Sequence, residues 1–153
     1  MCTVQTLLSI ARSWLGTPFG HQGRHKGHRA DCLGFVLETC REAGLVDAVG
    51  LPAAWDYQGY GRYPDQYDLL THLGRYLPAV PRHQMRVGDV AVFALVGGMP
   101  AHLGFVGDGA EPFSLLHAFW ARTARLARVQ EHRLGPAWLR HLHAAYRLPL
   151  GEG

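Results

Sequence analysis

The sequence predicts an α+β domain in which N-terminal helices pack on a central antiparallel β-sheet. Apolar residues recur at helical spacing up to about residue 77, and after that the pattern changes to short apolar runs separated by Gly and Pro. The sequence contains no internal repeat. The 153 residues have the size of one ordinary domain, so we expect residues 1–153 to form a single unit.

Composition and charge exclude several classes of protein. Hydrophobic residues make up 48% of the chain and charged residues 18%, which is typical of a globular protein and not of a disordered one. The net charge of +3 favours acidic partners only weakly, so we expect no nucleic-acid partner. Three cysteines form too sparse and odd a set for a disulfide framework, so we expect them to be reduced.

Targeting signals are also missing from the sequence pattern. Residues 1–15 lack the basic leader and small-residue cleavage site of a secretion signal. No apolar run approaches the roughly 20 residues that cross a bilayer. We therefore expect a protein that is made in the cytoplasm and has no membrane span.

Three helices are expected before residue 80. The first has apolar residues at helical spacing from Val4 to Leu15 and stops at Gly16. Asp31 can cap the second, whose apolar stripe ends just before Gly44. The third runs along four leucines to Pro78. The segments between them, residues 19–30 and 46–66, are expected to be exposed loops, and the second is long enough to be a binding surface.

The second half of the chain is expected to form the sheet. VGDVAVFALV, HLGFVGD, FSLLHAFW and RLARVQEHRL read as successive strands separated by Gly and Pro turns. The tail, PAWLRHLHAAYRLP, predicts a short helix followed by a closing strand.

Cys32 follows the expected cap and so lies in the first turn of the second helix. Unpaired N–H groups and the helix dipole, worth about half a positive charge, favour a thiolate there. Such positions lower the pKa of a cysteine from about 8.5 to roughly 3.5–7.5, so we expect a nucleophile. Gly34 lacks a side chain, which lets a substrate carbonyl approach the backbone, and the Cys32 N–H is a candidate oxyanion donor.

A thiolate nucleophile needs a histidine base, and the base needs an orienting partner. His102 begins HLGFVGD, and His117 lies in FSLLHAF. In a hairpin centred between Gly109 and Ala110 these histidines face each other, with Cβ atoms ~4.5–5.5 Å apart. This register is assumed, and a slip by one residue would put them on opposite faces. His132 stands opposite His117 on the next strand and is the second choice for the orienting role.

Several blocks of the chain together resemble a known family. They are, in order, GTPFGHQGRHKGHRADCLGFVLETCREAGL, GDVAVF, AHLGFV, LLHAFW and VQEHRL, scattered over residues 14–134. They resemble the signature blocks of the NlpC family of papain-like cell-wall peptidases. The GTPF-HQ-KG-ADCLGFV form resembles the short variety carried by phage tails and gene transfer agents.

This resemblance implies a papain-like fold, no cofactor, and hydrolysis of peptidoglycan stem peptides between γ-linked D-glutamate and a diamino acid. It implies that Cys32 is the nucleophile, His102 the general base and later acid, and His117 the residue that orients His102. It also implies action at the cell wall or periplasm, with a phage-tail or tail-like assembly protein as partner.

The chain departs from the family pattern at Phe19, because many members have tyrosine in the corresponding GTPY-like block. The missing hydroxyl has to come from elsewhere, and Tyr57 and Tyr60 in the long loop are candidates, although turn tyrosines are often merely solvent-exposed. With Asp31 and Gly34 they form the expected substrate-binding set.

Other functions remain open at this point. His21, His25, His28 and Cys32 are all able to ligate zinc, although their spacing matches no common zinc finger. The basic segment 24–29 is able to meet a nucleic-acid backbone. A papain-like scaffold can also serve as a binding module, or as an amidase or acyltransferase on another substrate, because the triad specifies acyl transfer and not the acceptor.

Overall fold

The computed structural model describes residues 2–45, 66–123 and 125–152. Helix α1 spans Val4–Arg12, α2 spans Cys32–Glu42, α4 spans Gln66–Tyr76 and the short α5 spans Pro136–Leu139. Asp31 caps α2 by accepting a hydrogen bond from the Gly34 N–H. This cap confirms the predicted start of the second helix.

The main sheet is antiparallel throughout and has the strand order β3-β8-β4-β5-β6-β7. Its strands are β3 (Ala79–Val80), β4 (Val90–Val96), β5 (Met99–Gly107), β6 (Ser114–Phe119), β7 (Arg128–Arg133) and β8 (Leu142–Tyr146). The predicted strands are present, and the closing strand β8 lies inside the sheet, between β3 and β4. The α+β class with helices on an antiparallel sheet is confirmed.

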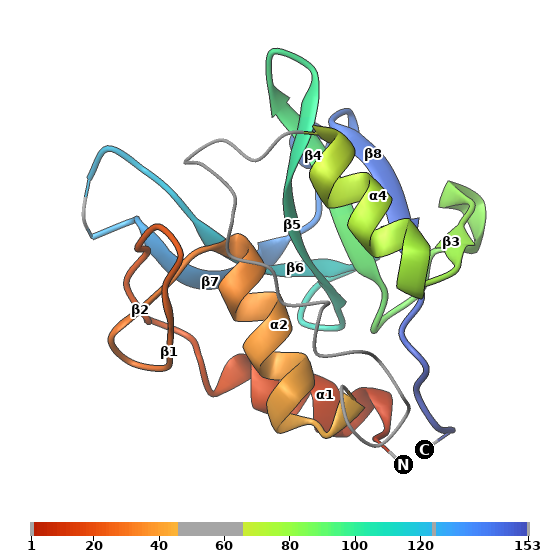
Figure 1. The fold of residues 1–153 in the computed structure, drawn as a ribbon, viewed down its shortest axis with the longest axis horizontal. Helices are drawn as coiled ribbons and strands as arrows, with labels where there is room; N and C mark the ends of the chain where they lie inside the picture. The colour runs from red at the N-terminus through yellow and green to blue at the C-terminus, as the bar shows by residue number, and fades with distance from the viewer. Residues whose placement is uncertain (1, 46–65, 124, 153) are drawn as a thin grey trace.

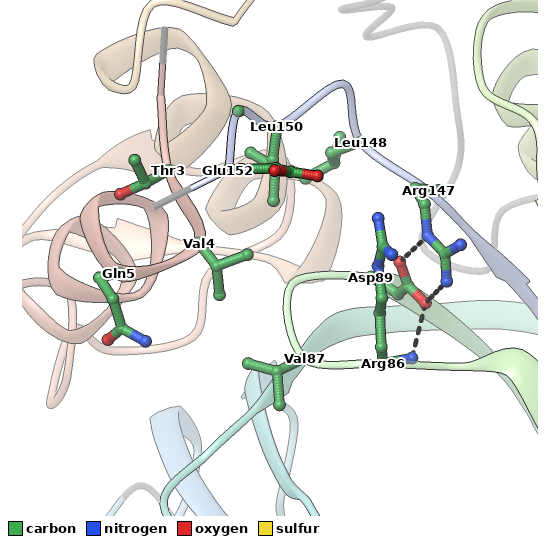
Figure 2. A pocket seen from close by; sticks show the side chains of 11 residues that line it. Thr3, Val4, Gln5, Arg86, Val87, Asp89, Arg147, Leu148, Leu150 and Glu152 are labelled. Carbon is green, nitrogen blue, oxygen red and sulfur yellow. Dashed lines mark hydrogen bonds and ion pairs between the residues drawn. The ribbon is translucent and has the colours of Figure 1, made fainter.

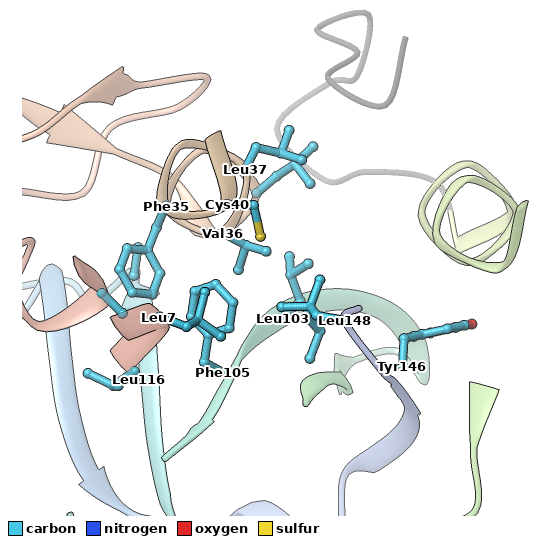
Figure 3. Close-up of a cluster of buried hydrophobic side chains, with 14 of the residues drawn as sticks. Leu7, Phe35, Val36, Leu37, Cys40, Leu103, Phe105, Leu116, Tyr146 and Leu148 are labelled. Carbon is cyan, nitrogen blue, oxygen red and sulfur yellow. The ribbon is translucent and has the colours of Figure 1, made fainter. Parts of the chain in front are cut away.

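Helices and sheet enclose two clusters of buried side chains, one on each face of the sheet. On the first face α2 lies across β5 and β6, with α1 beside it and α4 near β5 (Figure 1). Phe35 of α2 meets Phe105 of β5 edge to face there, with ring centroids 5.5 Å apart, among buried leucines (Figure 3). The second face carries Phe93, Val106 and Leu115, against which Trp138 of α5 packs.

Residues 19–30 are more ordered than the exposed loop that the sequence predicts. Strand β1 (Arg24–His25) pairs with β2 (Arg29–Ala30), and Gly27 at the turn has a φ of +81°. From this turn Lys26 reaches Glu42 of α2, with Nζ 2.8 Å from Oε1. Strands of two residues are too short to show an alternating pattern, which is why the sequence did not reveal this β1–β2 hairpin. None of the helices in the described ranges is long and apolar enough to cross a membrane.

Replacing Gly34 by Ala is expected to destabilise the protein. A Cβ atom at this position of α2 would overlap the Gly23 carbonyl oxygen and lie 2.6 Å from Arg24 Nη1. Overpacking of this kind costs ~1–3 kcal/mol, more than the ~1 kcal/mol by which Ala is favoured over Gly in a helix. The free energy of unfolding, measured by urea denaturation, should therefore fall.

Gly74→Ala is the matched control, because Gly74 is an exposed glycine of α4 whose added Cβ would meet nothing nearer than Tyr146 Cε1 at 4.0 Å. This variant should gain up to ~1 kcal/mol. Equal changes in both variants would contradict the close packing of the hairpin on α2.

Candidate active site

Cys32 is the first residue of α2, and its thiol reaches the neighbouring sheet. Sγ donates to the Ala101 carbonyl oxygen at 3.8 Å. That carbonyl belongs to the peptide group that joins Ala101 to His102, so the sulfur lies beside the backbone of His102. The structure therefore brings Cys32 and His102, which are 70 residues apart, to the same place.

A buried carboxylate fixes this end of α2. Asp31 is 4% exposed, and its oxygens accept from the Gly34 N–H at 2.7 Å, from the Gln22 N–H at 2.8 Å and from Arg24 Nη1 at 3.1 Å. The side chains of Arg24 and Asp31 are both nearly inaccessible to solvent. Asp31 thus joins the β1–β2 hairpin to the start of the helix that carries Cys32.

The pKa of Cys32 differs from the expectation based on the helix dipole. Burial and, to a smaller extent, the Asp31 carboxylate together raise the pKa of this thiol to about 12. Backbone hydrogen bonds from Leu103, Leu33 and Cys32 itself lower the pKa but are outweighed. Cys32 is therefore a neutral thiol at rest, and the prediction of a preformed thiolate is wrong because the sequence does not show how deeply the sulfur is enclosed.

Three histidines from three adjacent strands form a hydrogen-bonded row, which we call the histidine row: His102 on β5, His117 on β6 and His132 on β7. His102 Nε2 lies 2.7 Å from His117 Nδ1, and His117 Nε2 lies 2.8 Å from His132 Nε2. His132 Nδ1 lies 2.9 Å from the Arg133 carbonyl oxygen, which ends the row. The predicted contact between His102 and His117 is present, and His132 extends it.

Burial keeps the inner part of the histidine row uncharged. It lowers the pKa of His102 to about 4, with a smaller contribution from His132. His117 is fully buried, and burial, then His102, then His132 lower its pKa well below the ordinary value. Near neutral pH, His102 is therefore a neutral imidazole, which is the form that can accept a proton.

The strand register differs from the assumed one by two residues. Phe105 faces Leu116, whereas a hairpin centred between Gly109 and Ala110 would set it opposite Ser114. The register between β6 and β7 is also shifted by two residues, because His132 faces Leu115 and not His117. A shift of two keeps side chains on the same face, so the histidines become diagonal neighbours. The diagonal separation, about 7–8 Å between backbones, gives two imidazole rings room to meet end to end.

Two residues that support the histidine row were not identified from the sequence. A Cβ at Gly104 would lie 2.8 Å from His117 Cβ and 2.6 Å from the Leu116 carbonyl oxygen, so only glycine leaves His117 its place. Trp138 of α5 contacts all three histidine rings, with centroids 4.9 to 5.8 Å away. Glycine within the AHLGFV strand was a signal for the first, because it marks a close approach. Nothing in the sequence pattern marked Trp138.

The predicted substrate-binding residues lie in different surroundings. Asp31 points inward, as described above, and the space beside Gly34 is filled by Gly23 and Arg24, so the open approach expected there is not observed. Tyr57 and Tyr60 lie outside the described residues. Phe19 packs against the core, and its N–H donates to the Ala127 carbonyl. Substrate contacts of Asp31, Gly34, Tyr57 and Tyr60 stay predictions.

The alternative of a zinc site finds no support in the described ranges, where no group of three or more His, Cys, Asp or Glu side chains is arranged to hold a metal ion. His25 and His28 are exposed on the β1–β2 hairpin, whereas the Cys32 thiol points to β5. His21, His25, His28 and Cys32 are therefore not assembled as ligands.

A separate hollow is lined by residues near both ends of the chain, including Val4, Leu150 and the Asp89–Arg147 ion pair (Figure 2). Arg147 donates from Nε and Nη2 to the two Asp89 oxygens, each at 3.0 Å, and the Arg86 N–H donates to Oδ2 at 2.9 Å. Asp89 is thus occupied in holding β8 to the start of β4, so we assign this hollow no part in the chemistry.

Comparison with solved structures identifies the fold. An NLP/P60 family protein similar to a lipoprotein from Staphylococcus aureus aligns over 97% of this chain, with 18% identity and a TM-score of 0.63. An NlpC/P60 family protein from Bacillus cereus aligns over 95%, with 21% identity and a TM-score of 0.64. The NlpC/p60 domain of the peptidoglycan hydrolase SagA aligns over 95%, with 16% identity and a TM-score of 0.60.

The chain therefore has the papain-like fold of NlpC/P60 proteins, which confirms the resemblance at the level of the fold. It spans about two fifths of the first two structures, 42% and 40% of their chains, but 99% of the SagA domain. No protein-family model matches the chain, and no curated protein sequence matches it.

Replacing Asp31 by Asn is expected to lower the pKa of the Cys32 thiol. Asn can still cap α2, but it removes the carboxylate that raises this pKa, while the Arg24 cation stays nearby. The pH dependence of iodoacetamide alkylation at Cys32, followed by mass spectrometry of its peptide, should move to lower pH. Glu38→Gln removes a carboxylate from the same helix, away from the sulfur, and should leave the profile unchanged. An Asp31→Asn profile that stays in place or moves upward would contradict this account.

Proposed function

We propose that this protein is a cysteine endopeptidase that hydrolyses peptidoglycan stem peptides between γ-linked D-glutamate and a diamino acid. One observation carries the proposal. The Cys32 thiol contacts the peptide group that joins Ala101 to His102, and the His102 ring is hydrogen-bonded to His117 at 2.7 Å. A nucleophile, a base and an orienting group in this order are what acyl transfer requires.

The resting site holds a neutral thiol and a neutral imidazole, so the proton must move as the sulfur attacks. In the proposed acylation, His102 Nδ1, the ring nitrogen that His117 leaves unused, takes the proton from Sγ. The sulfur bonds to the carbonyl carbon and forms a tetrahedral oxyanion, for which the Cys32 N–H is the proposed donor. His102 then gives its proton to the departing amine, and a thioester remains.

Deacylation follows the same path with water in place of the thiol. His102 removes a proton from water, the hydroxide adds to the thioester carbonyl, and the C–S bond breaks. The sulfur recovers the proton from His102. His117 keeps the ring of His102 in one orientation through both halves of the reaction.

The substrate assignment is supported by two independent lines. The sequence blocks around Cys32, His102 and His117 resemble those of NlpC cell-wall peptidases. One structural neighbour is the NlpC/p60 domain of a protein described as a peptidoglycan hydrolase. The phage-tail-like form of the first block extends the proposal to action at the cell wall as part of a phage tail or tail-like particle.

An amidase or acyltransferase acting on another substrate is the alternative, because it would use the same three residues. Incubation with defined muropeptides and identification of the products by mass spectrometry separates the two. Hydrolysis at the γ-D-glutamyl bond supports the peptidase, whereas transfer to an added amine without hydrolysis supports an acyltransferase.

Cys32→Ala should abolish muropeptide cleavage while the fold is retained. Loss of the nucleophile is expected to reduce turnover by ~10⁴-fold or more. Product formation is measured by mass spectrometry and the fold by circular dichroism. Cys2→Ser is the control, because Cys2 lies before α1 and is not one of the three proposed catalytic residues, so this variant should keep wild-type turnover. Cleavage by Cys32→Ala, or loss of activity on chelation but not on thiol alkylation, would overturn the assignment.

A further inference from the structure

The end of the histidine row at Arg133 determines where each proton of the row sits. A backbone carbonyl can only accept, so His132 Nδ1, 2.9 Å from the Arg133 oxygen, must carry a hydrogen. In neutral His132, Nε2 is then bare and can only accept. His117 Nε2, at 2.8 Å, must therefore be the donor in the second bond.

The hydrogen on His117 in turn determines the tautomer of His102. A neutral His117 with its hydrogen on Nε2 has a bare Nδ1, which accepts from His102 Nε2 at 2.7 Å. Neutral His102 then has its hydrogen on Nε2 and a bare Nδ1. A bare Nδ1 is the condition that His102 must meet to take a proton from Cys32.

We propose that His132 is a positioning residue: anchored on the Arg133 carbonyl, it fixes the tautomer of His102 through His117 and so keeps His102 Nδ1 free to act as the base. This role rests on the proposed function only in its last link, the use of His102 as a base. The tautomers themselves follow from the hydrogen bonds.

A proton added at His132 would reverse the direction of both hydrogen bonds between the three histidines. An imidazolium has hydrogens on both nitrogens, so His132 Nε2 would donate to His117 Nε2. His117 would then carry its hydrogen on Nδ1 and donate to His102 Nε2, and His102 would carry its hydrogen on Nδ1. His102 would remain neutral but could no longer accept the thiol proton. A proton held on His132 would therefore inactivate the site.

The charged and titratable groups around His132 allow this switch. His117 faces it from β6 and Trp138 packs on its ring from α5. On its own strand, Arg133 directs its guanidinium to the Glu111 carbonyl at 3.0 Å, and Glu131 is bound to Arg12 and Ser114 on the other face of the sheet. In the described part of the chain, the hydrogen-bond partners of His132 are His117 and the Arg133 carbonyl.

Two variants distinguish positioning from simple packing. In His132→Gln, the side-chain carbonyl can still accept from His117. Turnover at neutral pH should stay within ~3-fold of wild type, because the accepting carbonyl keeps the hydrogen bonds of the row in the same direction. In His132→Lys, the ammonium can only donate, so the hydrogen bonds of the row stay in the reversed direction. Its kcat should fall by ~10²-fold or more, with KM within ~3-fold.

Long-range ¹H–¹⁵N NMR spectra of the full chain read the tautomers without any substrate. Wild type at neutral pH should show hydrogens on His102 Nε2, His117 Nε2 and His132 Nδ1, and His143→Gln, at an exposed position of β8, should show the same set. A wild-type His102 with its hydrogen on Nδ1, or full kcat in His132→Lys, would each overturn the proposal. If the tautomers are as expected but wild type cleaves no muropeptide, the proposed function fails and the tautomer assignment stands.

Discussion

The buried carboxylate of Asp31 is the constraint on which the arrangement of the site depends. It caps α2 through the Gly34 N–H, accepts from the Gln22 N–H and pairs with Arg24, so one side chain fixes both where the helix begins and how the β1–β2 hairpin lies on it. Because Cys32 is the next residue, the cap also determines where the sulfur meets β5. Removing one member of a buried ion pair costs far more than the pair itself contributes, so loss of either side chain would destabilise this junction.

The same carboxylate has an electrostatic cost for the chemistry. A negative charge beside the thiol and the enclosure of the sulfur both oppose ionisation, and together they outweigh the backbone donors at the helix start. Burial likewise keeps His102 and His117 neutral. A site of this kind has no preformed ion pair between a thiolate and an imidazolium. It holds neutral partners in place, and charge has to develop during the reaction, so the position of each proton matters more than the net charge of the site.

Much of this could be predicted from the sequence. Apolar periodicity located α1, α2, α4 and the long strands, and the cap at Asp31 located the start of α2. The short hairpin at residues 24–30 was missed because two-residue strands have no period, and the protonation of Cys32 was missed because burial depends on distant segments. The fold class needs only local patterns, whereas the site depends on contacts between residues far apart in the chain.

The histidine row shows both what local sequence patterns predict and what depends on contacts between distant residues. His102, His117 and His132 are each 15 residues apart, a regular spacing across three antiparallel strands that is visible in the sequence. Alternation fixes their common face, and a register error of two residues leaves that face unchanged. It does change which residues face each other, and in the structure the diagonal neighbours meet nitrogen to nitrogen. Gly104 explains the diagonal arrangement, because β5 can approach His117 closely only at a residue without a side chain. His102 lies two residues before Gly104 on the same strand, and from there its Nε2 reaches His117 Nδ1 at 2.7 Å.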